Sequence, residues 1–191
     1  MKTHRWKVGK SNFFLLKGVR VIKTLKFIVD NNVGKLAKWL RIMGYDTLFF
    51  NGSNDSGLVA TALNEERVIL TRDTQIMRRR VVTSGRLKVV LIKSEEPERQ
   101  MRQVMKALNL DCQFGLFTIC LECNQPLVER SKQQVQDLVP PYVFQTQSQY
   151  MECPTCHRIY WKGTHWRAMT RRLKKLMKGS AGGNMELRNG H

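Results

Sequence analysis

Residues 25–47, LKFIVDNNVGKLAKWLRIMGYDT, decide the fold of this chain. Residues 25–30 are short, apolar and rich in β-branched and aromatic side chains, which is typical of a buried strand. Within 33–40 the apolar residues recur at i, i+3, i+4 and i+7, while Arg41 belongs to a separate basic face, and Gly44 ends the helical pattern. The stretch therefore predicts a strand followed by an amphipathic helix.

The same alternation continues along the chain. Further strands are predicted at 47–50, 68–71 and 88–92, and further helices at 58–63, 74–82 and 97–108. Pro97 suits the first turn of the last of these helices. Four strands alternating with helices predict an α/β fold, a parallel sheet flanked by helices with right-handed crossovers.

The positive charge is concentrated at the two ends of the chain. The sequence has 33 Lys and Arg against 15 Asp and Glu, a formal charge of +18. Residues 1–29 and 153–185 each carry eight basic residues and no acid. This distribution favours binding to phosphates of a nucleic acid, although a solvated basic surface is the alternative.

Hydropathy limits the class of protein. No apolar run approaches the roughly 20 residues that a membrane helix needs, so the sequence predicts no transmembrane segment. The apolar patch at 13–16 ends at Lys17 and lacks a small-residue cleavage site, unlike a secretory signal. We therefore expect a cytoplasmic protein whose thiols stay reduced.

Three acidic residues follow predicted strands. Asp30 ends the first strand, Asp55 lies in the loop after the second, and Asp73 comes directly after the third. Because the ligand site of a parallel α/β sheet lies at the carboxyl ends of the strands, all three should project from one edge. Asp46 precedes the second strand, so we expect it at the opposite edge in a structural role.

Three converging carboxylates repel one another unless a cation lies between them. Hard oxygen ligands suit Mg²⁺ or Mn²⁺, ions that activate water and stabilise charge on phosphorus. Asp30, Asp55 and Asp73 are therefore the candidate metal ligands and catalytic residues. The alternatives are a helix N-cap for Asp55 and strand-end turns for Asp30 and Asp73.

Basic and amide side chains adjoin the same edge. Lys35 and Arg72 are candidate RNA contacts, because each lies close in sequence to one of the aspartates. The triplet 78–80 could contact substrate or form a solvated helix face. Asn31 and Asn32 could hold a metal-bound water or a phosphate, or could cap the helix.

Two cysteine pairs form the most specific local pattern. Cys120-x-x-Cys123 and Cys153-x-x-Cys156 are separated by 29 residues, a spacing typical of a closed four-thiolate zinc site. Disulfides are the alternative. The pattern predicts a structural zinc that holds a small ribbon together.

Aromatic and basic residues alternate in and after the second cysteine pair. Aromatic rings can stack on unpaired bases while the cations follow phosphates, but some rings of the region could instead form the ribbon core. A basic helix is predicted at 166–178. The candidate RNA contacts here are Arg158, Lys162, His165, Trp166, Arg167, Arg171 and Arg172.

These patterns divide the chain into four segments. We expect a basic extension at 1–24, a nuclease-like α/β domain at 25–116, a zinc ribbon with its basic helix at 117–178, and a disordered tail at 179–191.

Several stretches occur in the order seen in one family. KFIVDNNVGKLAKWLRIMGYDT, RVILTRD, CLECNQPL, VPPYVF and ECPTCHRIYWKGTHW resemble the Mut-seven C-terminal RNase domain family, over about residues 25–169. The resemblance implies a PIN-like fold with a zinc ribbon, divalent-metal-dependent hydrolysis of RNA, and acidic ligands at Asp30 and Asp73. By analogy with PIN enzymes, products would carry 5′-phosphate and 3′-hydroxyl ends.

Three functions remain in competition at this point. The first is an endoribonuclease acting on RNA, which could be structured or ribosomal. The second is a non-catalytic RNA- or ribosome-binding protein with a vestigial acidic pocket. The third is a DNA-binding zinc-ribbon regulator, which leaves the strand-end aspartates without a role.

Overall fold

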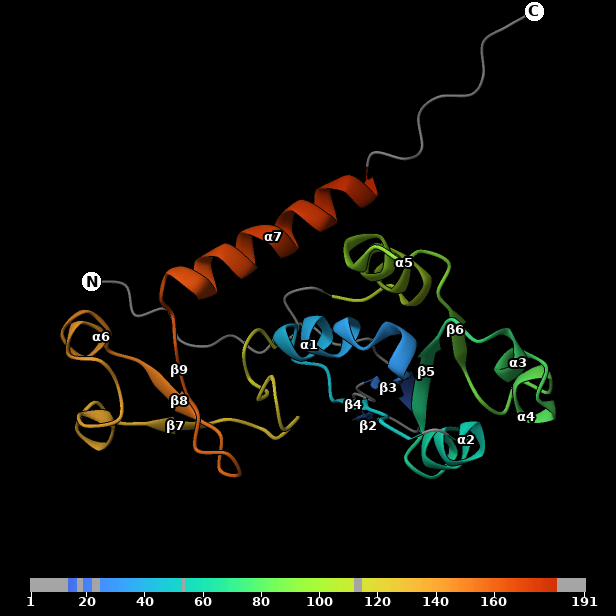
Figure 1. Cartoon of the computed structure of the whole chain (residues 1–191), viewed down its shortest axis with the longest axis horizontal. Coiled ribbons are helices and arrows are strands. Elements are labelled where there is room, and N and C mark those ends of the chain that lie inside the picture. The colour runs from blue at the N-terminus through green and yellow to red at the C-terminus, as the bar shows by residue number, and fades with distance from the viewer. Residues whose placement is uncertain (1–13, 17–18, 22–24, 53, 112–114, 182–191) are drawn as a thin grey trace, which may run out of the picture. The chain divides into compact units, whose positions relative to one another are not determined.

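The computed structural model describes residues 14–16, 19–21, 25–52, 54–111 and 115–181 (Figure 1). The chain forms two compact units. The first comprises Met1–Leu127 together with Cys153–Cys156, and the second comprises Val128–Glu152 together with His157–His191. Both cysteine pairs thus belong to the first unit. The sequence pattern instead assigned them to a separate segment at 117–178, and the division of the chain into four functional segments stays a prediction.

A four-stranded parallel sheet forms the centre of the first unit and confirms the predicted fold class. Its strand order is β4 (Thr47–Phe49), β3 (Lys26–Val29), β5 (Arg67–Thr71) and β6 (Val89–Leu91). All five residues of β5 are buried, as expected of a central strand covered on both faces.

Helices connect these strands, and one further helix follows β6. They are α1 (Lys35–Ile42), preceded by the short 3₁₀ turn η1 (Asn31–Val33), then α2 (Asp55–Asn64), α3 (Thr74–Met77), α4 (Arg80–Thr83) and α5 (Pro97–Leu108). Helix α1 packs against α5, while α2 packs against β3 and β5 (Figure 1). Pro97 occupies the first turn of α5, as its sequence position predicts.

The predicted helix at 74–82 is wrong, because the chain breaks it into α3 and α4. Arg79 between them has extended backbone angles, φ −66° and ψ 137°. Ile76 and Val81 both pack into the core cluster around Ile28. In one continuous helix these two residues would point about 140° apart, so the break lets both reach the same core.

Part of the expected basic extension is structured. Strands β1 (Phe14–Leu16) and β2 (Val19–Val21) pair in an antiparallel arrangement. The rest of the extension, residues 1–13, 17–18 and 22–24, lies outside the described residues.

Gly44 ends α1, as predicted, and allows a close backbone contact. It has φ +87°, a conformation that glycine adopts without steric penalty. A Cβ atom built at Gly44 would lie 2.2 Å from the carbonyl oxygen of Gly115. The Gly115 amide donates to the Met43 carbonyl at 3.0 Å, so the segment after α5 is held against the end of α1.

The edge of the sheet opposite the strand-end aspartates carries an ion pair, in agreement with the structural role predicted for Asp46. The Arg67 guanidinium donates to both Asp46 carboxylate oxygens, at 2.7 and 3.1 Å. The Asn124 amide donates to Asp46 Oδ1 at 2.6 Å. Burial alone would raise the pKa of Asp46, but these hydrogen bonds from Arg67 and Asn124 hold that pKa below its ordinary value.

The second unit contains a small antiparallel sheet. Its strands β7 (Val128–Arg130), β8 (Tyr150–Glu152) and β9 (Ile159–Trp161) lie in chain order. The 3₁₀ turn η2 (Gln133–Val135) and helix α6 (Pro141–Thr146) connect β7 to β8.

The core of this unit consists of Val135, Val139 and Tyr150, with Trp161 packed against them. Tyr150 is therefore a core residue, and the partly buried Trp161 packs against the same core.

Helix α7 (Thr164–Ala181) ends the described part of the chain. It confirms the predicted basic helix but extends it at both ends. Residues 179–181, expected to begin a disordered tail, are helical, and the remainder of that tail lies outside the described residues. No helix of the described residues combines the length and apolar character needed to cross a membrane.

Replacing Gly44 by alanine should destabilise the first unit. The left-handed backbone costs about 1–2 kcal/mol for a residue with a Cβ atom, and the contact with Gly115 adds about 1–3 kcal/mol. Urea unfolding followed by circular dichroism measures the loss. Gly85→Ala is the matched control, because Gly85 has φ +76° but open space around it; equal losses in the two variants would contradict the steric argument.

Asp46→Asn should alter how stability depends on pH. Because folding lowers the pKa of Asp46, its contribution is present above the unfolded pKa of about 3.9 and is lost as pH falls through the folded value. The wild-type chain should therefore be more stable than Asp46→Asn at pH 7, and the difference should shrink below about pH 4. A difference that stays constant in unfolding curves down to pH 2 would count against this ion pair.

Candidate functional site

Asp30 lies at the carboxyl end of β3 with its side chain oriented by three neutral donors. Its Oδ1 accepts a hydrogen bond from the Asn31 amide at 2.6 Å. Its Oδ2 accepts from the Thr71 hydroxyl at 2.6 Å and from the Asn32 side-chain amide at 2.7 Å. The hydrogen bond from the Asn31 amide also caps η1. Asp30 therefore has the predicted turn role, and the same bond helps to fix the orientation of its carboxylate.

Asp73 is joined to Asp30 through Thr71. The Thr71 hydroxyl, which donates to Asp30, accepts a hydrogen bond from the Asp73 backbone amide at 3.0 Å. The Asp73 side chain caps α3 by accepting from the Gln75 amide at 2.7 Å. Thr71 is fully buried, and sequence reasoning missed it although it stands two residues before Asp73 at the end of a strand.

The two asparagines organise the loops of the same edge. Asn32 donates to Asp30 and accepts from the Arg72 backbone amide at 3.0 Å, which connects the loops after β3 and β5. Asn31 donates to the Gly52 carbonyl at 3.3 Å. Their described contacts are thus with the protein's own loops.

Asp55 lies in a different local network. Asn54, not Asp55, is the N-cap of α2 and accepts from the Ser56 amide at 2.8 Å. Asp55 Oδ2 lies 3.8 Å from Arg79 Nη2. The structure therefore links Asp30 and Asp73 through hydrogen bonds and leaves Asp55 beside a cation.

Asp30 and Asp73 also differ from Asp55 in their distance to the nearest described cations. Among the described lysine and arginine side chains, none comes within 4.0 Å of the carboxylate of Asp30 or Asp73. Arg72 instead pairs with Glu95 at 2.8 Å, and Lys35 is exposed at the start of α1. Asp30 and Asp73 are therefore two carboxylates at one sheet edge that pair with no lysine or arginine among the described residues.

The four predicted zinc cysteines converge. The sulfur atoms of Cys120, Cys123, Cys153 and Cys156 all lie within 4.8 Å of one another. Cys120 Sγ and Cys156 Sγ are 3.7 Å apart, close to the edge of about 3.8 Å expected for tetrahedral thiolates with bonds near 2.3 Å to zinc. Among the described residues, these cysteines are the group of three or more His, Cys, Asp or Glu side chains that lies close enough together to hold one metal ion.

The two cysteine turns have the same local geometry. The Cys123 amide points at Cys120 Sγ, at 3.4 Å. Asn124 and His157, each directly after the second cysteine of its pair, have φ +60° and +56°. Asn and His tolerate this left-handed conformation better than most residues, and it turns the chain away after each pair.

Two of the four clustered thiols have raised pKa values. A hydrogen bond to Cys156 raises the pKa of Cys123 to about 12, and burial raises the pKa of Cys153. Both shifts favour the neutral thiol at Cys123 and Cys153. A bound cation reverses this preference, because a coordinating thiol is deprotonated.

His157 has a structural partner and is not part of the cysteine group. Its Nδ1 lies 2.8 Å from Glu152 Oε1, while Arg130 donates to Glu152 Oε2 at 2.6 Å. These hydrogen bonds hold the pKa of Glu152 below its ordinary value.

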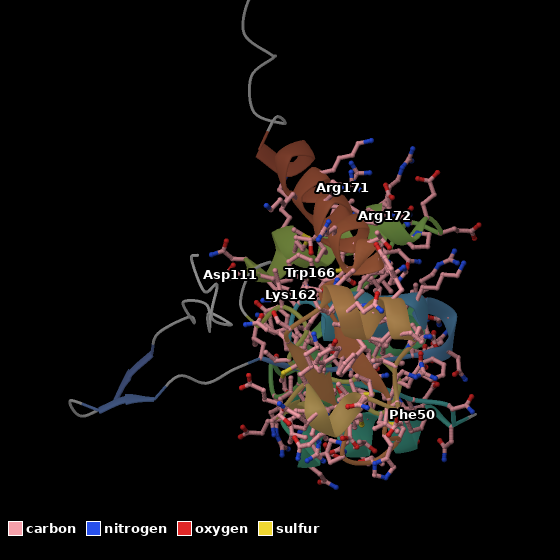
Figure 2. The ribbon with its side chains drawn as sticks, turned by 90° about the vertical axis from the view of Figure 1, so that its left-hand side faces the viewer. Phe50, Asp111, Lys162, Trp166, Arg171 and Arg172 are labelled. Carbon is pink, nitrogen blue, oxygen red and sulfur yellow. The ribbon has the colours of Figure 1, made fainter. Side chains whose placement is uncertain are left out.

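The predicted RNA contacts of the second unit lie in the segment that leads into α7 and on the helix itself. Figure 2 shows Arg171 and Arg172 on α7, with Trp166 and Lys162 near its beginning. The Lys162 ammonium lies 5.9 Å from the Trp166 ring centroid. Burial lowers the pKa of Lys162. The exposed members of the predicted set are Arg158, His165, Arg167, Arg171 and Arg172.

Comparison with known proteins identifies the family. Residues 25–173 match the family model described as the Mut7-C RNAse domain, a span that includes Asp30, Asp73 and the four cysteines. No curated protein and no solved structure matches the chain. The match covers most of the chain and indicates a nuclease-like function related to RNA. The protein belongs to the Mut7-C RNAse domain family.

Proposed function

We propose that the protein is a divalent-metal-dependent endoribonuclease. The observation that carries the proposal is the Asp30–Thr71–Asp73 linkage at the carboxyl edge of the sheet. Both carboxylates lack a described lysine or arginine partner, so a metal cation would not have to displace such a partner to bind them. Ligands of parallel α/β sheets bind at this edge.

Asp30 and Asp73 supply the carboxylate oxygens that Mg²⁺ and Mn²⁺ prefer as ligands. When bound, such an ion activates water and stabilises the charge that develops on the phosphodiester. Thr71 and Asn32 restrain the Asp30 carboxylate through their hydrogen bonds. This orientation is set before metal or RNA binds, which reduces the reorganisation required for reaction.

Asp55 is the third proposed ligand. A cation held at Asp55 would repel Arg79, so ion binding requires their 3.8 Å pair to separate. The released guanidinium would then be available to an RNA phosphate.

Exposed cations provide the proposed grip on RNA. Lys35 and Arg72 adjoin the aspartates, and Arg167, Arg171 and Arg172 give α7 a basic character. Each cation that contacts a phosphate releases condensed counterions, so RNA binding should weaken as salt increases.

The four cysteines are proposed to hold a structural zinc. Four thiolates fill a tetrahedral shell and leave no open position for substrate, which argues against a catalytic zinc. Reduced thiols of this kind fit a cytoplasmic location.

Asp30→Asn and Asp73→Asn should each reduce RNA cleavage by about 100-fold or more, because loss of a metal ligand removes several kcal/mol of transition-state stabilisation. Metal-free protein is incubated with labelled RNA pools, and cleavage is followed after addition of Mg²⁺ or Mn²⁺. Glu96→Gln is the matched control, since its carboxylate forms a surface pair with Arg99. Wild-type rates in both aspartate variants would remove the catalytic assignment.

The same assay decides the role of Asp55 and the competing function. Asp55→Asn should reduce cleavage if Asp55 is a ligand, and should leave it unchanged if its role is confined to Arg79. Salt-sensitive RNA binding without any cleavage, in the presence of either metal, would favour the non-catalytic RNA-binding function instead.

The purified chain should contain about one zinc per molecule, measured by native mass spectrometry. Cys120→Ser should lose the metal and lower the unfolding temperature, because binding energy at such a site is folding energy. A zinc content unaffected by this substitution would contradict the four-thiolate site.

A further inference from the structure

Arg41 is a buried charge at the first cysteine pair. Sequence reasoning placed it on the basic face of α1, but only 6% of the residue is exposed. Its Nε donates to the Thr47 carbonyl at 2.9 Å, and its Nη1 donates to the carbonyls of Leu121 and Glu122 at 2.7 and 3.0 Å. Leu121 and Glu122 are the two residues between Cys120 and Cys123.

Burying this guanidinium requires compensation. Burial lowers the pKa of Arg41, while nearby Cys120, Glu122 and Cys123 act in the opposite direction. Arginine nevertheless stays protonated in proteins, so Arg41 places a permanent positive charge beside the sulfurs.

The nearby carboxylates already have cations of their own. Glu122 pairs with Lys38 at 2.9 Å, and Asp46 pairs with Arg67. Of the four acidic side chains that act on the pKa of Arg41, the other two are Cys120 and Cys123. Four thiolates around one divalent cation carry a net charge of −2, which neutral thiols do not.

We infer that Arg41 is the charge partner of the four-thiolate metal site and couples metal binding to the folding of the α/β unit. The inference concerns the cysteine site alone and does not depend on the proposed nuclease activity.

A second contact supports the coupling. Asn124, directly after Cys123, accepts a hydrogen bond from the Thr47 amide at 2.7 Å and donates to Asp46. Arg41 and Asn124 thus both connect the first cysteine turn to the start of β4. Ordering of the cysteine turn by a metal should therefore also stabilise the start of β4 and helix α1 through these contacts.

Variants of the full-length chain separate charge from packing. Arg41→Met keeps much of the side-chain volume and removes the charge; Arg41→Lys keeps the charge and loses the planar hydrogen-bonding group. Asn124→Gly is the matched control, because it removes the contacts of Asn124 with Thr47 and Asp46 without removing a positive charge, and glycine tolerates the left-handed backbone.

The first measurement is zinc affinity, by competition with a chromophoric chelator. Arg41→Met should weaken zinc binding by about tenfold or more, the range seen when outer partners of metal ligands are removed. Arg41→Lys and Asn124→Gly should stay much closer to wild type. An unchanged affinity in Arg41→Met, or an equal loss in all three variants, would overturn the charge-partner role.

The second measurement is hydrogen exchange of the wild-type chain with and without zinc. Removing zinc should reduce amide protection in α1 and β4, and not only in the cysteine turns. Unchanged protection of both elements would overturn the coupling. This readout needs no variant, so it holds even where Arg41→Met fails to fold.

Discussion

The parallel pairing of β3 with β5 is the constraint on which both ends of the first unit depend. Its register sets Val29 beside Leu70, so the residues that follow, Asp30 and Thr71, meet at one edge. The same pairing sets Lys26 beside Arg67 at the opposite edge, where Arg67 binds Asp46. One edge thus carries two aspartates that no lysine or arginine of the described ranges pairs with, and the other edge carries the Arg67–Asp46 ion pair.

Much of this arrangement could be predicted from sequence, because the positions of the strands, their parallel direction and the cysteine spacing follow from local patterns, whereas the order of the strands in the sheet does not. Thr71 and Arg41 could not. A buried threonine at a strand end looks like any β-branched core residue, and a helical arginine beside lysines looks solvated. Their roles depend on partners far away in sequence: Asp30 lies 41 residues from Thr71, and Leu121 lies 80 residues from Arg41.

The break between α3 and α4 was missed for a related reason. Helical spacing within 74–82 is locally acceptable, and no proline or glycine interrupts it. The break is favoured because it lets Ile76 and Val81 pack into the same core as residues of α2 and β3. The same break sets Arg79 at the start of α4, beside Asp55, so a packing requirement of the core also decides the surroundings of a candidate ligand.

The allocation of Cys153–Cys156 to the first unit limits how the polypeptide can be divided. These four residues come from a loop whose flanking strands, β8 and β9, belong to the other unit. A fragment that stops at Leu127 retains only two of the four clustered cysteines, although it contains the whole parallel sheet. A cut at the boundary after Leu127 would therefore leave the two cysteine pairs in different fragments.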